Sequence, residues 1–139
     1  NEIEDKLLNK IKSIVKNEYN KKLIVSPFSK YAIEKGKELN IDYWKVASGE
    51  IYSDELLEEM IDSKIPIIVS TGLVDDDRLN YIAELLTRTS QLDKEHAVLH
   101  CVSSYPTPAR KANLARALAF RKNYPRLKIG ISDPRENLP

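Results

Sequence analysis

The sequence is poor in several residue types, and each shortage excludes a class of protein. Cys101 is the single cysteine among 139 residues, so no disulfide can form within the chain, and we expect a reducing, cytoplasmic location. No apolar run approaches the ~20 residues that a helix needs to cross a membrane. With 4 glycines and 7 prolines, the composition is not that of a fibrous or disordered chain.

An excess of charge of either sign is also absent. The chain has 22 basic and 21 acidic residues, for a net charge of +1. Such a balance creates no global field, so we expect neither nucleic acid nor a membrane surface as a partner, and any anion site must be local. The sequence has no G-x-G-x-x-G or Walker motif, which weighs against a nucleotide ligand.

The first residues do not form a signal peptide. Asn1–Asp5 is acidic and continues into a helical period of apolar residues at Ile3, Leu7, Ile11, Ile14 and Val15. Because position 1 is not Met, we expect the chain to be part of a longer protein.

Short apolar runs alternate with helical patterns five times, which predicts an α/β fold. The expected strands are 23–25, 42–46, 65–69, 97–101 and 127–131, and the expected helices lie at 3–15, 30–39, 55–61, 75–87 and 113–122. The runs are continuously apolar, so we expect a parallel sheet buried on both faces. Strand starts about 20–30 residues apart suit a TIM-type (β/α)8 barrel, although a doubly wound sheet has the same alternation.

Small hydroxyl residues recur where the expected strands end. The segments are Ser26-Pro27, Ser48-Gly49-Glu50, Ser70-Thr71-Gly72, Ser103-Ser104 and Ser132-Asp133. In parallel α/β folds this edge binds ligands, and hydroxyls beside helix N-termini suit a phosphate or a carboxylate. The alternative is that these residues only form turns and helix caps.

Two charged residues near these ends are candidates for chemistry. Lys45 lies within a strand between Trp44 and Val46, where lysine is unusual, and could form a Schiff base, bind an anion or extend to water. Glu50 could contact a substrate, act as an acid–base group or cap the next helix.

The histidines and the cysteine have simpler interpretations. His96 and His100 would lie roughly 13 Å apart on one strand, which is too far to share a metal. We expect His100 to be a packed strand residue and Cys101 a small buried hydrophobe. Tyr105 could direct its phenol into the site or pack against the turn.

Together the strand-end motifs resemble those of the N-acetylneuraminate (sialic acid) synthase family. The matching segments, in order, are Val25–Phe28, Trp44–Ile51, Pro66–Leu73, Leu99–Pro106 and Gly130–Asp133. The resemblance covers nearly the whole chain. It implies that residues 1–139 are the central segment of a (β/α)8 barrel domain, with the first two strands and the last strand missing.

The resemblance also implies an activity and a set of site residues. Family members are enzymes that condense phosphoenolpyruvate with an open-chain N-acetylated hexosamine, such as N-acetylmannosamine, and release phosphate. The resemblance assigns phosphoenolpyruvate binding to Ser26, Lys45, Ser48, Ser70 and Ser132. Glu50 would contact the sugar, and Tyr105 would lie beside the site. We expect the whole protein to be a homo-oligomer with these two substrates as its partners.

One departure from the family pattern bears on activity. The family uses a divalent metal, Mn²⁺ or Mg²⁺, and one of its histidine ligands follows the Ser-Asp pair, where this chain has Pro134. We therefore expect no metal ligand in this chain and no catalysis by the 139 residues alone. The alternative function is a non-catalytic barrel remnant that acts as a binding or assembly module.

Overall fold

Five parallel strands form one sheet in which neighbours in the chain are neighbours in space. The computed structural model describes residues 2–72, 74–89, 96–102 and 113–132. The strands are β1 (Ile24–Val25), β2 (Tyr43–Val46), β3 (Ile67–Ser70), β4 (Ala97–Cys101) and β5 (Lys128–Ser132), and the sheet order is β1-β2-β3-β4-β5. In a doubly wound sheet this order would reverse at a switch point, so the order itself favours an arc of a barrel.

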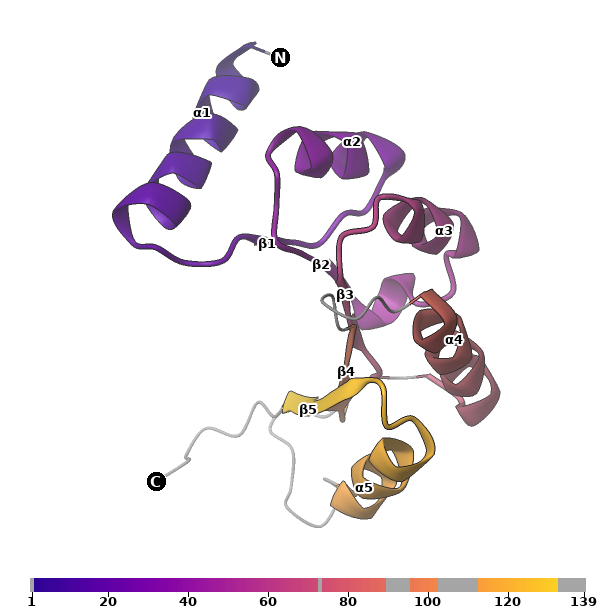
Figure 1. Ribbon diagram of the computed structural model, residues 1–139. Helices are drawn as coiled ribbons and strands as arrows, with labels where there is room; N and C mark the ends of the chain where they lie inside the picture. Colours follow the sequence, from indigo (N-terminus) through magenta and orange to yellow (C-terminus); the bar gives the residue numbers. More distant parts are fainter. Residues whose placement is uncertain (1, 73, 90–95, 103–112, 133–139) are drawn as a thin grey trace.

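The helices between the strands lie on one side of the sheet (Figure 1). They are α2 (Lys30–Glu38), α3 (Asp54–Asp62), α4 (Asp76–Thr89) and α5 (Leu114–Asn123), with a short 3-10 helix, η2 (Ser48–Glu50), after β2. The first helix, α1 (Glu2–Ser13), continues into a π-helical turn, η1 (Ile14–Glu18), and extends away from the sheet. This is the arrangement of a partial (β/α) barrel, as predicted.

Most of the buried side chains of the sheet lie on its helix-covered face. Along β2, Trp44 and Val46 are 0% and 1% exposed, whereas the alternating residues Tyr43 and Lys45 are only half-buried. The same alternation holds in β4. The prediction of burial on both faces is therefore wrong. Because the five strands form an open sheet, none of the described helices packs over the side chains of the other, concave face.

One core unites the helices and the covered face of the sheet. Trp44 of β2 packs directly against α2, where a Cβ atom built on Gly36 would lie 2.3 Å from the indole ring. The indole Nε1–H donates to Ser63 Oγ at 2.8 Å, which satisfies its buried donor. The core also includes Ile33, Ile67, Val69, Ile82 and Leu86.

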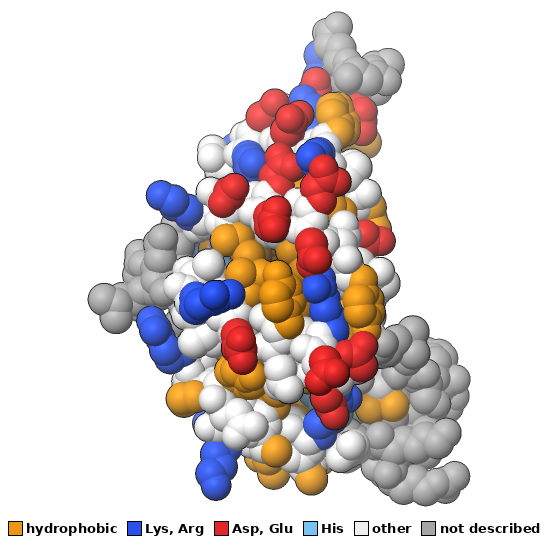
Figure 2. Space-filling model, turned by 90° about the vertical axis from the view of Figure 1, so that its right-hand side faces the viewer, with side chains coloured by type: hydrophobic (Ala, Val, Ile, Leu, Met, Phe, Trp, Pro, Cys, Tyr) orange, Lys and Arg blue, Asp and Glu red, His pale blue; other side chains and the backbone are white. Residues whose placement is uncertain are grey.

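The outer surface of the helices carries mixed charges (Figure 2). Acidic and basic side chains lie close together over the helices, with apolar side chains between them, and this matches ion pairs such as Lys30–Glu55 at 2.5 Å. None of the described helices is long and apolar enough to cross a membrane.

Candidate functional site

Lys45 and Ser70 meet on the concave face of the sheet. The Lys45 Nζ atom donates to Ser70 Oγ at 2.7 Å. Its neighbours in β2, Trp44 and Val46, point into the core beneath the helices. Because side chains alternate between the two faces along a strand, Lys45 points to the face that the described helices do not cover. Ser70 ends β3 and is 5% exposed, so the ammonium lies against a buried hydroxyl at the carboxyl end of two adjacent strands.

The turns that follow these two strands are also joined. The backbone N–H of Gly72 donates to Ser48 Oγ at 3.1 Å, and this links the turn after β2 to the turn after β3. Glu50 lies in the same turn as Ser48, at the end of η2, and is half-buried. Its backbone N–H donates to the Ala47 carbonyl at 3.0 Å, which fixes the 3-10 geometry.

Ser26 and Ser132 lie at the same edge but on the outer strands. Ser26 follows Val25, which pairs with Trp44, so Ser26 is level with Lys45 on the neighbouring strand. Ser132 pairs with Cys101 at the end of β5. Both side chains are exposed, and among the described residues no hydrogen bond joins either serine to Lys45 or Ser70. The structure thus brings together Lys45 with Ser70, and Ser48 with Gly72.

Other predicted residues fall outside the described ranges. These are Tyr105, the pair Ser103-Ser104 and Asp133. Their proposed places at the site stay predictions.

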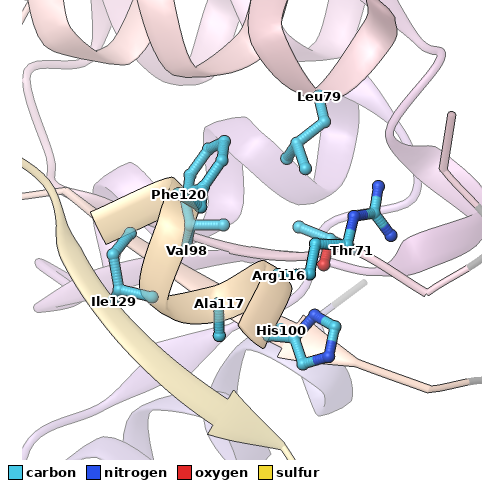
Figure 3. A pocket seen from close by; sticks show the side chains of 8 residues that line it. All are labelled: Thr71, Leu79, Val98, His100, Arg116, Ala117, Phe120 and Ile129. Carbon is cyan, nitrogen blue, oxygen red and sulfur yellow. The ribbon is translucent and has the colours of Figure 1, made fainter. Parts of the chain in front are cut away.

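His100 points away from this site, into the layer between the sheet and the helices. It lines a cavity of about 10 Å³ beneath α5, with Thr71, Leu79, Val98 and Arg116 among its neighbours (Figure 3). That volume suits one water molecule at most and is far too small for a sugar. His100 is 8% exposed, so its interpretation as a packed strand residue is confirmed.

Cys101 is only half-buried, contrary to the prediction that it is a buried hydrophobe. It lies on the uncovered face, two residues after Leu99, and its thiol donates to the Leu99 carbonyl at 3.2 Å. The sequence could not indicate which alternate residues of β4 the helices would cover.

The described residues do not form a site for a metal ion. Within residues 2–72, 74–89, 96–102 and 113–132, no three His, Cys, Asp or Glu side chains are grouped so that they could hold one. The donor set at Lys45 and Ser70, an ammonium and a hydroxyl, is suited to an anion rather than a cation.

Sequence reasoning missed a polar cluster next to the Ser48–Glu50 turn. Asp75 Oδ1 accepts the backbone N–H of Arg78 at 2.8 Å, which is an N-cap of α4, and Asp75 Oδ2 accepts the Tyr52 hydroxyl at 2.6 Å. These hydrogen bonds, that of Tyr52 foremost, hold the pKa of Asp75 below its usual value, and the same contact raises the pKa of Tyr52. The signal in the sequence was an Asp three residues before an Arg.

Comparisons with known proteins agree with this architecture. The sequence model of a family described as the NeuB family matches residues 2–138. A Drosophila melanogaster protein named N-acetylneuraminate-9-phosphate synthase is 28% identical over 115 residues, which are 83% of this chain and 30% of that protein. A pseudaminic acid synthase of Helicobacter pylori is 34% identical over 108 residues, which are 78% of this chain and 31% of that protein.

A solved structure is similar over nearly the whole chain. It is an N-acetylneuraminic acid (sialic acid) synthetase from Leptospira borgpetersenii in complex with citrate, with a TM-score of 0.83 and 26% identity. The match covers 96% of this chain and 45% of that one. The chain thus spans about a third of the length of the curated relatives that it matches.

Proposed function

Because the chain belongs to the NeuB family, we propose that its whole protein condenses phosphoenolpyruvate with an N-acetylated hexosamine such as N-acetylmannosamine. The product would be a nonulosonic, sialic-type acid, and inorganic phosphate would be released. In support, relatives of this chain are named as synthases of N-acetylneuraminate 9-phosphate, pseudaminic acid and N,N'-diacetyllegionaminic acid. These names share one class of product and differ in the sugar.

The contact between Lys45 and Ser70 carries the proposal. An ammonium has three N–H donors, and Ser70 accepts one of them, so the others can be donated to a ligand on the concave face. Phosphoenolpyruvate has a carboxylate and a phosphate, which are the groups that charge-assisted hydrogen bonds from lysine bind best. Ser48 and Ser70 supply hydroxyls at the same strand ends, and we assign Ser26 and Ser132 to the same ligand.

In this reaction the protein would position the two substrates and balance the negative charge of phosphoenolpyruvate. Lys45 would compensate the negative charge of phosphoenolpyruvate while the methylene carbon of phosphoenolpyruvate attacks the aldehyde carbon of the open-chain sugar. The π bond of the aldehyde would break and its oxygen would take a proton from water. The remaining hydroxide would add to the carbon that bears the phosphate, and the phosphate would then leave as inorganic phosphate. Glu50 would orient the sugar from the turn after β2, with Tyr105 beside it. The described residues do not fit the divalent metal that the family resemblance implies, so no step is assigned to it.

Lys45→Met in the whole protein tests this function. Phosphate release is measured with phosphoenolpyruvate, N-acetylmannosamine and Mn²⁺, and phosphoenolpyruvate affinity is measured by calorimetry. Loss of one charge-assisted contact costs ~1.5–3 kcal/mol, so affinity should fall roughly ten- to a hundredfold. Lys122→Met, at an exposed position of α5, is the matched control and should behave as the wild type.

Two results would contradict the proposal. Phosphoenolpyruvate affinity in Lys45→Met equal to that of the control would remove Lys45 from the site. A whole protein that binds phosphoenolpyruvate without sugar-dependent phosphate release, across N-acetylmannosamine and related N-acetylated hexosamines, would favour a non-catalytic binding module.

A further inference from the structure

Arg78 lies in an unusual setting for a residue on the outer side of the sheet. Its side chain is only 12% exposed, although it belongs to the first turn of α4. Both Nε and Nη2 donate to the Ile51 carbonyl, at 2.9 and 2.6 Å, and Nη2 also lies 2.5 Å from Asp54 Oδ1. A single guanidinium therefore holds a backbone carbonyl and the first residue of α3.

Two tyrosine rings lie close to this guanidinium. Its central carbon lies 5.4 Å from the centroid of Tyr52 and 5.0 Å from that of Tyr81, both within the range of cation–π attraction. Tyr52 is fixed in turn by its hydroxyl, which donates to Asp75. Asp75 also accepts the backbone N–H of Arg78. Arg78, Tyr52 and Asp75 are therefore each in contact with the other two.

The cluster holds one end of the turn that carries two proposed site residues. Ile51 directly follows Glu50, the last residue of η2, and Ser48 begins η2. Ser48 is held from the other side by the Gly72 N–H. Both restraints on the turn after β2 therefore come from the next β/α unit, one from the turn after β3 and one from α4.

The same device recurs one unit later in the chain. Arg116 is also the third residue of its helix, α5, and its Nη2 lies 2.5 Å from Asp76 Oδ1, the first residue of α4. Nη2 also donates to the Val74 carbonyl at 3.5 Å, in the segment between β3 and α4. In both cases an arginine near a helix start holds the preceding loop by a carbonyl and by the first carboxylate of the preceding helix.

We propose that Arg78 is a positioning residue for the reaction, which holds the Ser48–Glu50 turn so that Glu50 faces the amino-sugar substrate. The inference rests on the proposed function. Its physical reason is that a planar guanidinium presents several N–H donors in a fixed geometry, so it can donate twice to the Ile51 carbonyl and still reach Asp54, whereas a lysine ammonium lacks this geometry. A turn without this restraint would sample orientations in which Glu50 misses the sugar, and small misplacements are costly to catalysis.

Arg78→Lys in the whole protein is the first test. It keeps a positive charge near Asp54 but removes the paired hydrogen bonds from the guanidinium to the Ile51 carbonyl. We expect kcat to fall and KM for N-acetylmannosamine to rise, together lowering kcat/KM roughly tenfold or more. KM for phosphoenolpyruvate should change much less, since Lys45 lies on the strand and Ser48 keeps its bond to Gly72. Arg88→Lys, exposed near the end of the same helix, is the matched control.

Hydrogen exchange separates this inference from the proposed function. In Arg78→Lys, the backbone amides of residues 49–53 should exchange faster than in Arg88→Lys, whereas those of β3 and β4 should not change. This readout needs no activity, so it judges the restraint even where the wild type fails to condense the two substrates. A merely structural role would instead lower the melting temperature and leave the ratio of the KM for N-acetylmannosamine to the KM for phosphoenolpyruvate unchanged.

The inference is overturned by either of two results. One is exchange at residues 49–53 equal to that of Arg88→Lys. The other is an equal effect on both KM values in an active protein. Should Arg78→Lys not fold, Asp54→Asn, which removes only the exposed carboxylate of the cluster, gives a milder version of both measurements.

Discussion

His96 joins three strands where they begin. Its Nδ1 accepts the backbone N–H of Ile67, the first residue of β3, at 3.0 Å, and its carbonyl accepts the N–H of Lys128, the first residue of β5, at 3.0 Å. His96 itself directly precedes β4. The ring is 6% exposed, and burial lowers its pKa, against the opposing effect of a hydrogen bond to the Thr89 backbone. Only an unprotonated Nδ1 can accept the Ile67 N–H.

We therefore predict that the chain loses stability as pH falls through the histidine range. The pKa of folded His96 is lowered from 6.5, so its stabilising effect is full above that value and is lost as pH falls below it. Thermal unfolding between about pH 8 and about pH 5.5 checks this. In His96→Asn, whose side-chain oxygen can accept the same N–H, the decline over this window should be smaller.

The Asp42 carboxylate loses its charge in a more acidic window and should not mask this effect. Burial raises its pKa, but hydrogen bonds from the Leu23 N–H and Lys16 outweigh burial, so the net pKa lies below 3.8. Its contribution is present above that value and is lost only in stronger acid. An equal decline in wild type and His96→Asn would contradict the role of His96.

Gly36→Ala should destabilise the chain, although alanine is the better helix former. A Cβ atom at position 36 would lie 2.3 and 2.5 Å from two atoms of the Trp44 ring, which is itself fully buried. Overpacking of this kind costs about 1–3 kcal/mol, against a gain of about 1 kcal/mol in helix propensity. Urea unfolding measures the difference. Gly49→Ala, where a Cβ atom meets nothing within 4 Å, is the control and should be near neutral.

Ser63→Ala should cost about 1–3 kcal/mol of stability, because it leaves the Trp44 indole N–H buried without an acceptor. The Ser63 hydroxyl also donates to the Met60 carbonyl at 2.6 Å and accepts the Ile65 N–H at 3.3 Å. Unfolding can be followed by the fluorescence of Trp44, the one tryptophan in the chain. A Ser63→Ala protein as stable as the wild type would mean that water satisfies the indole.

The isolated 139 residues should not catalyse the condensation. Lys45 is half-buried on a face that none of the described helices covers, so water competes for its ammonium and weakens its attraction to an anion. The chain is incubated with phosphoenolpyruvate, N-acetylmannosamine and Mn²⁺, and phosphate is assayed. Sugar-dependent release well above that of Lys45→Met would show that these residues alone build a sufficient site.

Much of the fold was predictable, because local patterns determine it. The five apolar runs correspond to five strands, and the expected helix at 30–39 corresponds to α2 at Lys30–Glu38. The strand-end serines also marked the edge at which Lys45 and Ser70 meet. Arg78 was not predictable, since its partners Ile51 and Asp54 lie 27 and 24 residues away and nothing near it in the sequence indicates them.

The order of strands and helices, and the hydroxyls at the strand ends, follow from the sequence alone, because apolar runs, breakers and helical periods act over a few residues. Only the tertiary structure decided which face of each strand the helices cover, and therefore that Lys45 and Cys101 are half-exposed while His100 is buried. A strand pattern specifies alternation, but the direction of the alternation depends on packing against distant helices. The contact between Lys45 and Ser70, 25 residues apart, likewise requires the register between β2 and β3.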